Sequence, residues 1–293
     1  MGKYSKSKLK IKGWLKIIIV LFVIIIICAG AFLTYVLLNN NIVYEKIDTS
    51  AVNVSDDEAK NSTPIIVDNL ILGAVYDKKW VSSEKYYFKS DKKSEVEIDI
   101  YNKKGKAGKF ILNNIDKSKL NAAIYAKTTN TNTIDEYLAV ATSEKNIMPD
   151  PASKVQNITE ADIEIAKKAL GFKKIFNSSV KITEIYEAKI NENAYSRIMF
   201  VTNEIGKSTG AYSAVIYEDS TGKTKCIKYN YIRDLKDASN WPIYSFKFVA
   251  DLNKDGINEL IIQETKEFDV KYDILEYKNN NFKEILSSTM KQK

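Results

Sequence analysis

Residues 250–262 read ADLNKDGINELII, and this stretch decides the fold, because residues 188–200, AKINENAYSRIMF, align with it without a gap. The separation is 250 − 188 = 62 residues. Self-similarity at a fixed period is typical of repeat architectures. Each copy predicts a strand, a loop, a strand and a further hairpin. Two copies are too few for a closed propeller, so we expect a paired sheet or a sandwich over residues 178–293.

Short β-rich runs surround both copies. They are separated by turn residues, which favours antiparallel strands. The predicted strands are 180–190, 196–203, 211–217, 224–231, 244–250, 259–263 and 272–277.

The loop of the second copy places oxygen-bearing side chains at its positions 1, 3, 5 and 9. Gly256 at position 6 permits a sharp bend, and the carbonyl of position 7 adds a further oxygen. Hard cations such as Ca2+ bind six to eight oxygens. Ile262 stands where an EF-hand needs its last glutamate, which excludes that motif. The predicted ligands of one structural calcium are Asp251, Asn253, Asp255, Ile257 and Glu259. The alternative is a calcium-free hairpin loop whose Asp and Asn side chains bond their own backbone.

The pattern D-x-N-x-D-G-x-x-E-L, followed by an apolar strand, resembles the FG-GAP/VCBS-type repeats of extracellular β-rich proteins. The resemblance covers residues 244–286, and residues 182–231 through a degenerate copy. It implies that the oxygens at positions 1, 3, 5, 7 and 9 hold calcium in the second copy. In the first copy Lys189 and Arg197 replace positions 1 and 9, so no calcium is expected there.

The segment before the repeat predicts a small domain and a helix. Residues 65–145 contain candidate strands at 70–76, 95–101, 109–112, 122–126 and 137–141, which indicate a small antiparallel sheet or barrel. Residues 146–177 predict a linker and one helix. The helix begins at Thr159, which forms a capping box with Asp162, and ends at Gly171. The predicted fold class is mainly β (α+β).

An apolar run at 17–38 contains no charged residue and is long enough to cross a bilayer. Six lysines and no acid precede it, so residues 1–16 are predicted to be a cytoplasmic tail. Residues 39–64 are predicted to be a stalk that carries an extracellular C-terminal part. Cleavage after Ala31, which would release that part, stays an alternative.

Charge and composition exclude several function classes. The net charge is +7, and removing the tail leaves 44 − 6 = 38 basic against 37 acidic residues, so nucleic acid is not an expected partner. The absence of histidine excludes Ser-His-Asp and Cys-His catalysis and His-ligated metals. Cys28 and Cys226 are too few for a disulfide framework. Lysine outnumbers arginine 42 to 2, which fits an AT-rich, Gram-positive-like bacterium.

These features predict a membrane-anchored, extracytoplasmic, non-catalytic binding or sensing module with one structural calcium. The expected partners are the membrane, through residues 17–38, and an extracellular protein or cell-wall component. Two alternatives remain: an enzyme that acts on the cell wall, and a subunit of a membrane secretion or regulatory complex.

Overall fold

The computed structural model describes residues 54–90, 95–118, 123–128, 137–141, 149–171, 180–191, 194–203, 211–232, 239 and 241–291, all within one compact unit, Thr49–Lys293. The predicted tail, the membrane helix at 17–38 and most of the stalk lie outside these residues. Within the described ranges, no helix is both long and apolar enough to span a membrane. The mainly-β fold class is confirmed, because three antiparallel sheets make up most of this unit.

The first sheet is a small barrel. Strand β1 pairs with both β7 and β2, which closes a ring in the order β1-β7-β4-β5-β6-β2, and β3 extends it beyond β2. Strict alternation in β4 buries Ile98 and Ile100 in the barrel core and leaves Glu97 exposed. The strands are β1 Thr63–Val67, β2 Leu70–Tyr76, β3 Lys79–Ser82, β4 Val96–Asn102, β5 Gly105–Lys117, β6 Ile124–Thr128 and β7 Leu138–Ala141.

Two short helices complete the barrel core. Helix α2, Asp56–Lys60, contributes Ala59, and helix α3, Ser83–Lys89, contributes Tyr86. The predicted stalk is therefore wrong at its C-terminal end, since residues 54–64 belong to the folded unit. A helix of five residues is too short to show an apolar period, although Ser55 and Glu58 form a capping box around its first turn.

Each copy of the repeat forms its own antiparallel meander of four strands. The first copy forms strands β9 to β12 of the second sheet, whose order is β12-β11-β10-β9-β8; the short strand β8 precedes the repeat and pairs with β9. The second copy forms the third sheet, in the order β13-β14-β15-β16. The predicted linker is corrected in part, because Pro149 forms a bridge with Ala250 and β8 pairs with β9. The bounds are β8 Ser153–Lys154, β9 Lys181–Lys189, β10 Tyr195–Thr202, β11 Ala211–Glu218, β12 Thr224–Ile232, β13 Ile243–Ala250, β14 Glu259–Thr265, β15 Asp269–Lys278 and β16 Asn281–Lys291.

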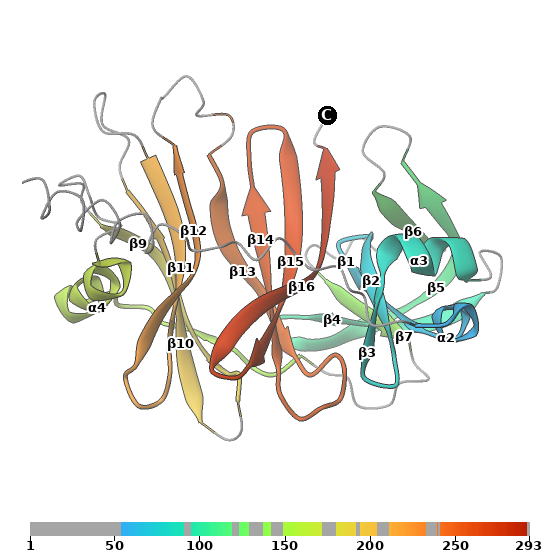
Figure 1. Ribbon diagram of the computed structural model, residues 1–293, viewed down its shortest axis with the longest axis horizontal. Helices are drawn as coiled ribbons and strands as arrows, with labels where there is room; N and C mark the ends of the chain where they lie inside the picture. Colours follow the sequence, from blue (N-terminus) through green and yellow to red (C-terminus); the bar gives the residue numbers. More distant parts are fainter. Residues whose placement is uncertain are drawn as a thin grey trace, which may run out of the picture. The chain divides into compact units, whose positions relative to one another are not determined.

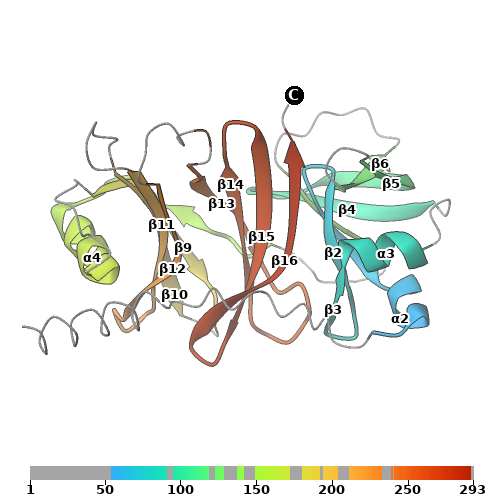
Figure 2. The ribbon, with the colours of Figure 1, turned by 45° about the horizontal axis from the view of Figure 1, so that its top comes forward.

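The third sheet lies between the second sheet and the barrel, as Figures 1 and 2 show. Alternate residues of β14 face the two neighbours: Leu260 packs in the core shared with the second sheet, and Ile261 packs in the core shared with the barrel. Helix α4, Glu160–Leu170, covers the other face of the second sheet and confirms the predicted helix, including its cap at Thr159. The two repeat copies thus form a sandwich whose outer faces are covered by α4 and by the barrel.

Candidate metal centre

The predicted calcium loop connects β13 to β14 and is wrapped tightly by its own side chains. The Asp251 carboxylate accepts hydrogen bonds from the backbone N–H groups of Asp255 and Gly256, both at 3.0 Å. The Asn253 side-chain oxygen also accepts from the Asp255 N–H, at 3.0 Å. Lys254 has φ 59° and Gly256 has φ 93°, so the backbone turns twice through the left-handed region. These hydrogen bonds from Asp and Asn side chains to the loop's own backbone are the ones expected of the alternative, a calcium-free hairpin loop.

Glu259 ends the loop and is completely buried, with 0% of its surface exposed. One carboxylate oxygen, Oε2, accepts a hydrogen bond from the Leu252 N–H at 2.8 Å. The other oxygen, Oε1, has no hydrogen-bond partner. A buried carboxylate oxygen without a partner loses its hydration and gains nothing in exchange, which is costly.

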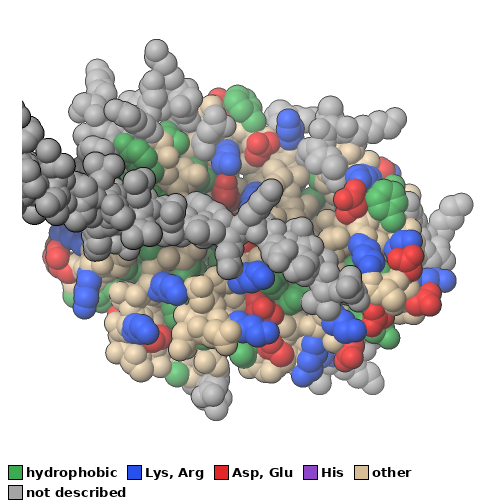
Figure 3. All heavy atoms as spheres, in the orientation of Figure 1, with side chains coloured by type: hydrophobic (Ala, Val, Ile, Leu, Met, Phe, Trp, Pro, Cys, Tyr) green, Lys and Arg blue, Asp and Glu red, His purple; other side chains and the backbone are tan. Residues whose placement is uncertain are grey.

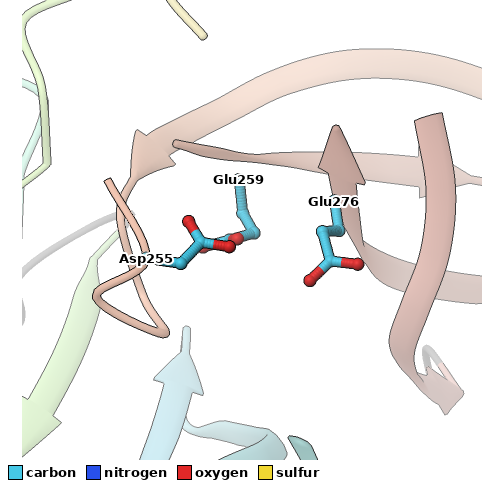
Figure 4. A group of neighbouring side chains, drawn as sticks. All are labelled: Asp255, Glu259 and Glu276. Carbon is cyan, nitrogen blue, oxygen red and sulfur yellow. The ribbon is translucent and has the colours of Figure 1, made fainter. Parts of the chain in front are cut away.

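A third acid, Glu276, comes from the neighbouring strand β15. The recorded register places Leu260 opposite Leu275, so the next pair along the two strands is Glu259 and Glu276. Oxygens of Asp255, Glu259 and Glu276 all lie within 4.8 Å of one another, and Figure 4 shows the three side chains reaching into one region. We call these three residues the acidic group.

Burial and neighbouring carboxylates change the acidity of Glu259. Burial, aided by the charges of Asp255, Asp251 and Glu276, raises the pKa of Glu259 to about 9 against the opposing effect of the Leu252 N–H. Ionising this carboxyl at pH 7 without a compensating cation therefore costs about 3 kcal/mol of folding free energy. Among the residues that the structure describes, no lysine or arginine forms an ion pair with any member of the acidic group.

The predicted ligands are only partly brought together. Asp255 and Glu259 join the acidic group, while Asp251 lies outside it and Asn253 lies beside it, with its amide nitrogen 3.4 Å from Glu276 Oε1. Ile257 forms a backbone bridge with Asn191 of the first copy. Glu276 was not predicted, because its contribution depends on the pairing of β14 with β15, and no spacing within the loop reveals that register.

The first copy has an internal cation at the corresponding place. Arg197 aligns with Glu259 and lies opposite Glu218 on β11, and continuing the β14–β15 register one residue past Leu260 and Leu275 sets Glu259 against Glu276. Its guanidinium forms ion pairs with Glu218, at 2.9 Å, and with Asp162 at the start of α4. The first copy thus pairs a cation with acids where the second copy places acids together.

Comparison with known proteins found no matching family model, no matching curated protein and no matching solved structure.

Proposed function

We propose that this chain is a membrane-anchored, extracytoplasmic binding or sensing module whose third sheet is stabilised by one calcium ion, and that its repeat is of the FG-GAP/VCBS type. The observation that supports the ion best is Glu259, a buried carboxylate with an unpartnered oxygen beside Asp255 and Glu276. A divalent cation at that point supplies both the missing partner and the missing positive charge. Carboxylate and amide oxygens suit a hard cation, which favours calcium over a soft metal.

The residues that would hold the ion are the predicted loop ligands together with Glu276. Open extracellular calcium modules bind with Kd values of about 0.1–1 mM, and we expect that range here. At such an affinity the ion is structural: it fixes the loop between β13 and β14 and neutralises the facing acids of β14 and β15.

Calcium titration of the full chain in mild detergent, followed by calorimetry, tests this site. We expect a single binding event that Asp255→Ala abolishes. Asp219→Ala is the matched control, because Asp219 caps the β11–β12 turn through backbone N–H groups but lies outside the acidic group. Equal binding by wild type and Asp255→Ala would refute the assignment.

An open polar hollow on the barrel is a candidate binding surface. Its volume is about 820 Å3, and the described residues that line it, none of which carries a carboxylate, are Asn69, Asn113, Asn114, Tyr125, Ala126 and Lys127. Amide groups beside an aromatic ring suit a neutral polar ligand such as a cell-wall glycan, whereas glycoside hydrolysis requires a pair of carboxyl groups. Binding of cell-wall glycan by wild type but not by Tyr125→Ala would support this role, and equal retention of both would contradict it.

The distribution of charge supports the expectation that nucleic acid is not a partner. On the face drawn in Figure 3, lysine and arginine side chains alternate with acidic ones and do not form a continuous basic surface.

The membrane anchor and the extracellular location rest on residues 1–38 alone. Protease treatment of intact cells should digest the C-terminal part and protect the lysine-rich tail.

A further inference from the structure

We propose that the cation site is shared between the repeat and the barrel, so that calcium, by fixing Glu276, holds strand β3 of the barrel against the third sheet through Trp80. This inference rests on the proposed calcium site. It adds Trp80, which lies far from the loop in sequence, as a residue that positions the Glu276 carboxylate. Trp80 donates a hydrogen bond from its indole Nε1–H to Glu276 Oε1, at 3.1 Å. The contact joins the barrel directly to a member of the acidic group.

The position of Trp80 makes this hydrogen bond sensitive to where the Glu276 carboxylate lies. The indole packs, partly buried, against the core that the barrel shares with the third sheet. Its N–H therefore needs an acceptor on that side, and Glu276 is the acceptor that the structure provides. A displacement of the Glu276 carboxylate would leave the indole N–H without this partner.

Electrostatic repulsion acts on the same carboxylate. Glu276 lies within 4.8 Å of oxygens of Asp255 and Glu259, so the charge of Asp255 repels its carboxylate, and the Asn253 amide at 3.4 Å compensates only weakly. A bound divalent cation turns this repulsion into attraction and favours the position in which Glu276 accepts from Trp80. Because coupling between two interactions is reciprocal, the Trp80 contact must strengthen cation binding by the same factor.

Strand β3 transmits this constraint to the helices of the barrel. Lys79, the neighbour of Trp80, forms an ion pair at 2.7 Å with Glu58 of α2, and Ser82 caps the N-terminus of α3. Calcium should therefore slow local opening of residues 79–89 and leave α4, on the opposite side of the sandwich, unaffected.

A second polar contact between the barrel and the third sheet provides a control. The Tyr272 hydroxyl donates to Asp68 Oδ2 at 2.7 Å, and Lys247 pairs with the same oxygen at 3.0 Å. None of these three residues belongs to the acidic group or to the loop. Tyr272→Phe thus weakens the same interface without touching the cation site.

The test combines hydrogen exchange with calorimetry on the full chain in mild detergent. Calcium should increase amide protection in β3 and α3 of the wild type. Trp80→Phe, which keeps an aromatic ring but removes the N–H, should raise the calcium Kd about five-fold or more and abolish the added protection. Tyr272→Phe should keep the wild-type Kd.

The outcomes separate this inference from the calcium site itself. Wild-type calcium binding with no change in β3 protection would overturn the shared site while the proposed site stands, and this result does not depend on whether a variant folds. An unchanged Kd in Trp80→Phe, or an equal loss in Tyr272→Phe, would also overturn it. Absence of calcium binding by the wild type would overturn both proposals.

Discussion

At the scale of single residues, Glu259 determines the behaviour of the site. Its carboxyl is fully buried, one of its oxygens has no partner, and its pKa is raised to about 9 by burial and by nearby acids. The loop spacing predicted its participation, because position 9 of the pattern requires an oxygen. The sequence could not predict its burial or its facing acid Glu276, since both depend on how β14 pairs and packs.

Glu259→Gln should stabilise the metal-free chain and abolish calcium binding. The amide keeps the shape and the acceptor for the Leu252 N–H but has no carboxyl group, so folding at pH 7 no longer requires Glu259 to take up a proton. In chelator at pH 7 we expect the free energy of unfolding to rise by up to about 3 kcal/mol, measured by urea denaturation. A variant less stable than wild type in chelator would contradict this account.

The same carboxyl determines how metal-free stability depends on pH. Its folded pKa, about 9, lies above the ordinary value of 4.5, so the folded state binds the proton more tightly. The stabilisation is fully present below pH 4.5 and is lost as the pH rises toward 9. In chelator, wild-type stability should therefore decrease over this window relative to Glu259→Gln, and parallel curves for the two proteins would disprove the assignment.

At the scale of elements, β-rich runs between turn residues located most strands, and several of the missed elements were very short. β2 was predicted with its exact bounds, because LILGAVY is a clear β-rich run. β8 has only two residues, and α2 and α3 have five and seven, too few for a period to emerge. β16, Asn281–Lys291, was not predicted because its burial is irregular along its length.

Arg197 holds α4 on the second sheet, so its removal should be costly. Arg197→Met leaves Asp162 and Glu218, which are 5% and 9% exposed, without their shared cation. We expect a loss of about 3 kcal/mol in unfolding free energy. Lys109→Met removes the partner of the exposed Glu97 on the barrel and should change stability by less than about 1 kcal/mol. Similar losses in both variants would show that burial of the acids is unimportant.

At Gly73, barrel strand β2 lies too close to its neighbours to leave room for a side chain. A Cβ atom there would lie 2.6 Å from the Val81 carbonyl oxygen and 2.6 Å from Leu286 Cδ1 of β16. Gly73→Ala should lower the free energy of unfolding by about 1–3 kcal/mol. Leu286→Ala should not rescue it, because the Val81 carbonyl belongs to the backbone and cannot rotate away. Full rescue would indicate that the clash with the Leu286 side chain, and not the one with the Val81 carbonyl, causes the loss of stability.

At the scale of the whole described unit, the third sheet shares one core with the second sheet and another with the barrel. The repeat predicted a paired sheet or a sandwich, and the sequence could not show what covers the outer faces of the two sheets. The reason is visible in β14, where Leu260, Ile261 and Ile262 are all buried, so no polar face distinguishes one neighbour from the other.

Calcium should therefore stabilise barrel and repeat together. At 5 mM calcium, a Kd of about 0.1–1 mM adds about 1–2 kcal/mol to the free energy of unfolding. Fluorescence of Trp80 should report the barrel and that of Trp241 the repeat, and both transitions should shift equally in urea. A shift confined to Trp241 would indicate that the barrel unfolds independently of the cation site.

A crystal structure of the protein grown in calcium tests the central claim most directly. We expect one ion, located by its anomalous signal, with oxygens of Asp255, Glu259 and Glu276 about 2.3–2.6 Å away. Trp80 should still donate to Glu276 in that structure. A loop without an ion at saturating calcium, or an ion bound away from Glu259, would contradict the account.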